Sequence, residues 1–229
     1  MNHMNTLDSA GYGISQQQRH RVLRNTYWLL ALSMLPTVLG AWIGVSTGIT
    51  RSLTGGMGLV VFMVGAFGFM FAIEKTKNSA AGVPVLLAFT FFMGLMLSRM
   101  IAMVLGFSNG SQLVMTAFAG TAGVFFVMAS LATVIKRDLS GMGKGLFVGA
   151  LVLIVGSIIK IFVGSPGGMM AISLLAVGIF SAFMLYDIKR ILDGGETNYI
   201  SATLSLYLNI YNVFQSLLAL LGIMGGDRE

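Results

Sequence analysis

Long apolar segments alternate with short polar connections along the chain after its first two dozen residues. Each segment is close to the roughly 20 residues that a helix needs to cross a bilayer. The segments are continuous, which favours transmembrane helices over the alternating ten-residue strands of a membrane β-barrel. We expect seven helices, near residues 25–46, 55–73, 81–103, 112–135, 144–164, 168–190 and 200–223.

The residues before the first apolar segment differ from the rest. Residues 1–24 are polar, with a Gln-Gln-Gln run followed by basic side chains. This basic cluster comes late, and the apolar run after it has the length of a membrane span rather than of a signal peptide. We therefore expect a flexible cytoplasmic tail over residues 1–24 and a seven-helix membrane domain over residues 25–226.

Composition supports the membrane class. Hydrophobic residues make up 56% of the chain and charged residues 10%, whereas soluble domains carry roughly 25% charged residues. So little polar surface cannot cover a soluble globule. We read the net charge of +6 as a sign of membrane topology, and we expect the lipid bilayer rather than nucleic acid as the partner.

Basic residues are unevenly divided between the two sides of the predicted bundle. If the N-terminus is inside, the inner side holds Arg19, Arg21, Arg24, Lys75, Lys77, Lys136, Arg137, Lys144, Lys189 and Arg190, and the outer side holds Arg51, Arg99, Lys160 and Arg228. The positive-inside rule then predicts a cytoplasmic N-terminus. Seven spans put the C-terminus in the periplasm, unless the sixth segment only dips into the membrane.

Asp187 is the first candidate for a functional side chain. It follows the apolar run LLAVGIFSAFMLY and precedes Ile188, so it belongs to the last turns of the sixth helix. A carboxylate beside hydrocarbon marks a functional site by default. Two interpretations stay open: an interfacial side chain that faces cytoplasmic water, or a buried and paired one whose protonation reports pH.

The last helix carries polar side chains at helical spacing. They are Ser201, Ser205, Asn209, Asn212 and Ser216, at steps of four, four, three and four. Such steps place them on one face, and lipid cannot satisfy them, so we expect this face inside the bundle. Tyr207 and Tyr211 add hydroxyls one turn apart. The stripe is either a set of interhelical hydrogen bonds or the wall of an ion or proton path, and the helix should be central.

Enzyme signatures are missing from the sequence. There is no HExxH motif and no glycine-rich phosphate loop, and both histidines, His3 and His20, precede the first apolar segment. The absence of cysteine excludes thiolate metal sites and cysteine nucleophiles. We expect neither catalytic activity nor a bound metal or cofactor.

Small residues recur four apart. Examples are Gly40 with Gly44, and Gly141 with Gly145 and Gly149. This spacing lets helices approach closely, so we expect tight packing within one bundle.

The segment LYDIKRI, followed by GGETNYISATLSLYLNIYNVFQSLL, resembles the C-terminal signature of the Bax inhibitor-1 family of seven-helix membrane proteins. HRVLRNTYWLL near the start is similar to the bacterial YccA-like branch of that family. The resemblance runs from about Arg19 to the C-terminus. It implies an all-α integral membrane fold in which six helices wrap around a central seventh.

The resemblance also implies a site. In calcium-leak members, a pair of aspartates on the sixth and seventh helices forms a pH-sensing gate. Asp187 matches the first aspartate and Asn209 stands in place of the second, so one group titrates here instead of a coupled pair. A basic partner is implied too, with Lys75 and Lys77 as the nearest candidates. A pH-sensitive leak of Ca²⁺ or protons is therefore the alternative function.

The YccA-like branch implies a different role, because its members are similar to substrates and modulators of FtsH, the membrane-bound ATP-dependent protease of bacteria. A polar tail is long enough for a hexameric unfoldase to grip, and a compact bundle behind it resists extraction. We therefore expect an inner-membrane protein that binds FtsH and inhibits it as a slowly degraded substrate. Arg19, Arg21 and Arg24 belong to the segment that the protease would grip.

Overall fold

Seven α-helices make up the part of the chain that the structure describes. The computed structural model describes residues 15–53, 55–163 and 166–225. The helices are α1 (Gln16–Thr47), α2 (Gly55–Thr76), α3 (Gly82–Leu105), α4 (Gly110–Val134), α5 (Met142–Val163), α6 (Pro166–Leu192) and α7 (Tyr199–Gly225), and a 3-10 helix, η1 (Ile49–Ser52), follows α1. Six α-helices are long and apolar enough to cross a membrane, and α5 is apolar over Met142–Ile158. The described residues contain no strand, which confirms the predicted all-α class.

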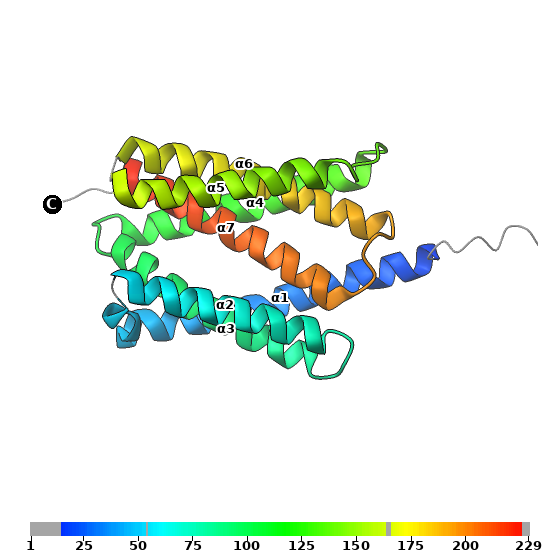
Figure 1. Cartoon of the computed structure of the whole chain (residues 1–229), viewed down its shortest axis with the longest axis horizontal. Helices are drawn as coiled ribbons and strands as arrows, with labels where there is room; N and C mark the ends of the chain where they lie inside the picture. Colours follow the sequence, from blue (N-terminus) through cyan, green and yellow to red (C-terminus); the bar gives the residue numbers. More distant parts are fainter. Residues whose placement is uncertain (1–14, 54, 164–165, 226–229) are drawn as a thin grey trace, which may run out of the picture.

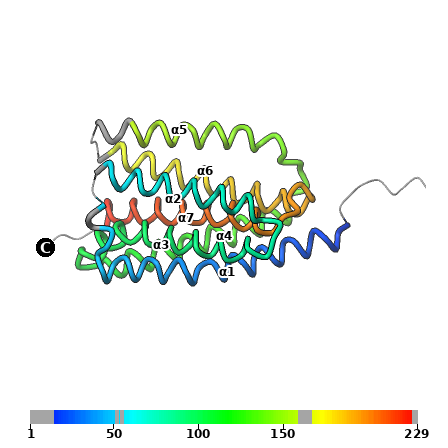
Figure 2. Tube along the Cα trace, turned by 60° about the horizontal axis from the view of Figure 1, so that its bottom comes forward, coloured from blue at the N-terminus to red at the C-terminus, as the bar shows by residue number. Residues whose placement is uncertain are grey.

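The last helix is the centre of the bundle. α7 packs against α1, α2, α3, α4 and α6, and it lies between the other helices in both views (Figures 1 and 2). Half of its apolar span, 50%, is buried inside the protein, against 39% or less in the other five candidate spans. The predicted central position of the last helix is thus confirmed, while α5 packs on α6 at the outside of the bundle.

The closest helix pair is α1 with α3. A Cβ atom added to Gly40 of α1 would lie 2.2 Å from the carbonyl oxygen of Phe91, and one added to Gly94 of α3 would lie 2.1 Å from that of Thr37. The two backbones therefore touch directly, as small residues permit in membrane helices. The expectation of close packing is confirmed for this pair of helices.

The glycines at the start of α5 behave differently. A Cβ atom on Gly141 or Gly145 would meet nothing within 4 Å. The expectation of close packing at these two positions is wrong, because α5 is a peripheral helix and this part of its surface has no neighbour. Gly149, one turn later, does pack against Ile179 of α6, 3.1 Å from the place of a Cβ atom.

The first helix begins at Gln16, nine residues before the predicted start at residue 25. Ser15 caps it by accepting a hydrogen bond from the backbone N–H of Gln18 at 3.2 Å. The segment up to Arg24 has no helix breaker, and Val22 already packs into the core. The predicted flexible tail is therefore helical over residues 16–24, and residues 1–14 lie outside the described part of the chain.

The sixth segment forms a full-length helix. α6 is continuous over 27 residues and meets the length and hydropathy expected of a membrane span. A helix of this length and hydropathy favours a full span over a segment that only dips into the membrane, and the side of the C-terminus stays a prediction. α1 begins at one end of the bundle and α7 ends at the opposite end (Figure 1).

We predict that Gly94→Ala destabilises the bundle, whereas Gly178→Ala does not. The new methyl group at Gly94 would collide with backbone atoms of α1, while the one at Gly178 would meet nothing within 4 Å. Overpacking of this kind costs about 1–3 kcal/mol, and a Gly-to-Ala exchange in an open helix position is favourable. Thermal unfolding in detergent measures both variants, and equal midpoints would contradict the close α1–α3 contact.

Candidate functional site

Asp187 and Asn209 form a polar contact between α6 and α7. The Asn209 Nδ2 amide donates a hydrogen bond to Asp187 Oδ2 at 2.7 Å. Asn209 is 6% exposed, and Asp187 is partly buried. The structure thus brings together the two positions that the sequence singled out, and Asp187 has the helix-to-helix partner that the second interpretation required.

The expected basic partners of Asp187 have other contacts. Lys75 lies over the ring of Phe71, 5.4 Å from its centroid, and Lys77 pairs with Glu74. Two other charged side chains lie at this end of α6: Arg190, three residues after Asp187, and Glu196, whose Oε2 lies 3.7 Å from Arg190 Nη2. Neither was proposed for this site from the sequence.

A signal for Arg190 was present in the sequence. Arg190 follows Asp187 by three residues in the same helix, and side chains at this spacing are neighbours on a helix surface. From the sequence, Arg190 is assigned only to the cytoplasmic set of basic residues.

Two tyrosines connect α7 to α1 and α3. The Tyr207 hydroxyl lies 3.0 Å from Thr37 Oγ1 of α1 and donates to the Thr90 carbonyl of α3 at 3.4 Å. The Tyr211 hydroxyl donates to the Met93 carbonyl, also of α3, at 3.4 Å. Both rings are buried, so these hydroxyls are satisfied by protein in the interior.

The predicted polar stripe of α7 divides into two parts. Asn209, Tyr207 and Tyr211 are buried, whereas Ser205 and Asn212 are only partly buried. Asn212 Nδ2 donates to the Leu208 carbonyl of its own helix at 2.7 Å. Ser201 and Ser216 are also partly buried, so full burial holds for Asn209 alone among the five stripe residues, and the amide of Asn212 is satisfied by a carbonyl one turn back.

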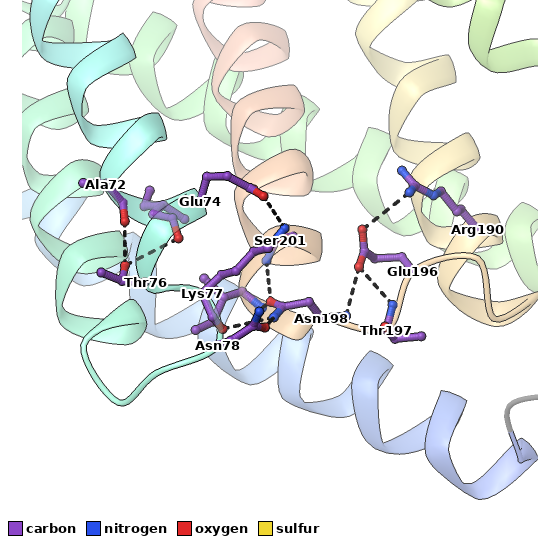
Figure 3. A network of polar contacts seen from close by, with 12 residues as sticks. Ala72, Glu74, Thr76, Lys77, Asn78, Arg190, Glu196, Thr197, Asn198 and Ser201 are labelled. Carbon is purple, nitrogen blue, oxygen red and sulfur yellow. Dashed lines mark hydrogen bonds and ion pairs between the residues drawn. The ribbon is translucent and has the colours of Figure 1, made fainter.

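The connection between α6 and α7 is held by Glu196. Glu196 Oε1 accepts from the backbone N–H groups of Thr197 and Asn198, both at 2.9 Å, and Oε2 lies 3.7 Å from Arg190 Nη2 (Figure 3). Gly194 has a φ of 83°, a left-handed conformation that glycine adopts without strain. Gly194 and Gly195 reverse the chain between the two helices, and the Arg190–Glu196 ion pair joins this turn to the end of α6.

Asn198 joins this connection to the α2–α3 connection. Its Nδ2 donates to the Lys77 carbonyl at 3.0 Å and to Asn78 Oδ1 at 2.8 Å, while its Oδ1 accepts from the N–H groups of Ile200 and Ser201 (Figure 3). The side chain is thus the N-cap of α7. The contact with the α2–α3 connection could not be read from local spacing in the sequence.

We predict that Asn209→Leu destabilises the bundle more than Asn212→Leu. The first exchange removes the hydrogen bond to Asp187 and leaves that carboxyl without its amide donor, at a cost of about 1–3 kcal/mol. The second removes only a bond within α7, so we expect a change of less than about 0.5 kcal/mol. Unfolding midpoints in detergent measure the difference, and similar losses in both variants would refute it.

Comparisons with known proteins give a consistent result. A family model described as "Inhibitor of apoptosis-promoting Bax1" matches residues 19–226. The chain is 38% identical over 208 residues to the "Modulator of FtsH protease YccA" of Escherichia coli K12, which covers 91% of this chain and 92% of that one. It is 37% identical over 211 residues to a membrane protein of Vibrio cholerae, covering 92% of each chain. A Campylobacter jejuni protein is 30% identical over 87% of each chain.

Proposed function

We propose, from the premise that this chain belongs to the family described as inhibitors of apoptosis-promoting Bax1, that it modulates a membrane-bound ATP-dependent protease of the FtsH type in the bacterial inner membrane. The observation that carries the proposal is the similarity to the Escherichia coli modulator of FtsH protease, which extends over nine-tenths of both chains. A second relative carries the name "Inner membrane protein". In this proposal the chain acts by being a slowly extracted substrate.

The packing of α1 supports slow extraction. An unfoldase that pulls from the N-terminus must remove α1 first, and α1 is the helix whose backbone touches α3 at Gly40 and Gly94. The Thr37 hydroxyl of α1 also bonds to Tyr207 of the central helix. Removing α1 therefore breaks the closest helix contact and exposes polar groups of α7 in one step. A protease engaged on this chain remains occupied while it works against these contacts.

The start of α1 supports access to the protease. Arg21 and Arg24 are exposed, while Arg19 turns toward the end of α6 and donates to the Leu192 carbonyl at 3.3 Å. The three arginines thus belong to a helix rather than to a free tail. The segment for the protease to grip is then the one that precedes Ser15, and we propose that it lies in the cytoplasm, on the side where ten of the fourteen Lys and Arg residues gather.

We predict that deleting residues 2–14 lengthens the lifetime of the protein and abolishes protease inhibition. The deletion keeps the Ser15 cap of α1, so the bundle retains its unfolding midpoint. Pulse-chase labelling should show a half-life severalfold longer in cells that contain the protease, and no change in cells that lack it.

A chain in which a Gly-Ser segment of equal length replaces residues 2–14 is the matched control. It should be degraded like the wild type, because in this proposal the protease needs a segment of sufficient length before Ser15 rather than a defined sequence. An unchanged half-life of the deletion variant would contradict the proposal.

A second function, a pH-sensitive leak of protons or Ca²⁺ through the bundle, is favoured by the Asp187–Asn209 contact. One carboxyl group between two membrane helices changes its charge with pH, and its neighbour is an amide that does not titrate. Loss of that charge as pH falls would weaken the hydrogen bond from Asn209, because bonds to ionised acceptors are the stronger ones. Arg190, three residues after Asp187 in α6, and its partner Glu196 are charged groups at the same end of α6.

We predict that any flux follows a single protonation and that Asp187→Asn removes its pH dependence. Asn209→Asp should add a second titration step, because two adjacent carboxyls titrate as a coupled pair. Flux from proteoliposomes across a pH series measures both variants. Asp138→Asn is the control: hydrogen bonds from Ser140 hold the pKa of the Asp138 carboxyl below its ordinary value, so it stays ionised near neutrality. If Asp187→Asn keeps the full wild-type pH dependence of flux, Asp187 is not the titrating group.

A further inference from the structure

A cleft lies between the ends of α1, α4 and α6, at the end of the bundle where the chain enters its first helix. It has a volume of about 370 Å³. The side chains that line it include Gln16, Arg19 and His20 of α1, Thr133 of α4, and Lys189 and Leu192 of α6. Neither the protease proposal nor the Asp187–Asn209 contact uses this cleft.

Two cationic side chains face the cleft and are held in place. Arg19 Nη1 donates to the Leu192 carbonyl at 3.3 Å, at the C-terminus of α6, where a positive charge is favourable. Lys189 Nζ donates to Asp193 Oδ1 at 2.6 Å, and the Lys189 side chain is only 12% exposed. An ammonium group carries three donors, so the single bond to Asp193 leaves Lys189 able to bind an oxygen of a ligand.

The surroundings of the cleft are positive. Lys136 and Arg137 follow the lining residue Thr133 by three and four positions, and Arg19 and Lys189 line the cleft itself. Among the described residues, the carboxylate of Asp193 pairs with Lys189, and Asp138 is bound by the backbone N–H and the hydroxyl of Ser140. The two cations that line the cleft, Arg19 and Lys189, favour an anion there.

The cleft lies at the ends of three helices that are candidate membrane spans. It is built from the first turns of α1 and the last turns of α4 and α6. Leu131 and Val134, on either side of the lining residues Ala132 and Thr133, are 41% and 72% exposed and so face lipid. Trp28 of α1 is 73% exposed, and tryptophan is enriched at membrane interfaces. Acyl chains therefore reach the helix end that carries the cleft.

We propose that this cleft binds the phosphate group of an anionic phospholipid. Lys189 and Arg19 would hold the phosphate oxygens, Thr133 would offer a hydroxyl, and the acyl chains would lie on the exposed end of α4. Basic clefts between membrane helices on the cytoplasmic side are suited to acidic headgroups. A lipid bound there would bridge α1 to α6 and α4, and would stabilise the start of α1.

The test is thermal unfolding of the full chain in detergent with added short-chain phosphatidylglycerol, phosphatidylcholine or inorganic phosphate. We expect phosphatidylglycerol to raise the midpoint and phosphatidylcholine not to. Arg19→Gln and Lys189→Gln should each weaken the apparent affinity about fivefold, the effect of one basic residue at an anionic membrane surface. Arg24→Gln, which removes an exposed arginine of α1 outside the cleft, should keep the wild-type affinity.

A second variant covers the possibility that loss of Arg19 or Lys189 prevents folding. Thr133 is exposed, and its hydroxyl bonds to the Ser130 carbonyl of its own helix, so Thr133→Glu should fold while it places a negative charge in the cleft. We expect it to abolish the preference for phosphatidylglycerol over phosphatidylcholine.

Each outcome bears on the proposal. A shift with phosphatidylglycerol alone that is lost in the cleft variants supports a lipid phosphate. An equal shift with inorganic phosphate, lost in the same variants, supports the phosphate site with a free anion as its source. No shift with either, or a shift that Thr133→Glu leaves intact, overturns the site. Loss of protease association in the variants, with unchanged lipid response, identifies the cleft as a protein contact and also overturns it.

Discussion

The need to satisfy polar groups away from water determines how this bundle is arranged. α7 carries hydroxyl and amide side chains in a helix that is otherwise apolar, and lipid offers them no partner. Tyr207 bonds to α1 and α3, Tyr211 bonds to α3, and Asn209 bonds to α6. The central position of α7 follows from these bonds, since only a helix surrounded by others can direct polar side chains toward three neighbours. The remaining helices are placed by their contacts with it or with one another.

The α1–α3 pair and the α5–α6 pair are held together by different kinds of contact. α1 and α3 are held by backbone contact at glycines, which leaves no room for adjustment. α5 packs on α6 through larger side chains, such as Ile179 against Gly149 and Tyr186 against Gly143, and it has no other close neighbour among the described helices. A force applied to α1 would therefore act first on the backbone contact between α1 and α3. This asymmetry suits a chain that is difficult to extract from its N-terminal end.

Much of the fold could be predicted from the sequence. The seven helices follow from the length of the apolar runs, and the centrality of α7 follows from its polar residues. The start of α1 was misjudged because polar and basic residues suggest a tail, although Gln16–Arg24 forms helix once Ser15 caps it and Val22 packs inside. The interior face of α7 was only partly predicted. Spacing shows which residues share a face, but it does not show that Asn212 bonds to its own helix.

The candidate site was predicted in the same partial way. Asp187 and Asn209 were found because an acid in an apolar run is conspicuous and the family signature contains both positions. Glu196 was not found, because it belongs to the α6–α7 turn, whose path depends on the left-handed Gly194. Arg190 could have been found, because it lies one turn after Asp187 in α6. The cleft at the helix ends was not foreseen either. It is formed by three helices far apart in the sequence, and no local pattern reports that arrangement.

The Asn198 side chain has a consequence for motion within the bundle. Its Oδ1 caps the first turn of α7 by accepting two backbone N–H groups, and its Nδ2 donates hydrogen bonds to the α2–α3 connection. The donor and the acceptor belong to the same planar amide. If the amide rotates to keep its bonds with the α2–α3 connection, its bonds with the first turn of α7 are misaligned, and the reverse also holds. Displacement of the α2–α3 connection and fraying of α7 are therefore mechanically linked events, and the energy of a helix cap, about 1 kcal/mol, opposes any opening of the bundle between α2 and α7.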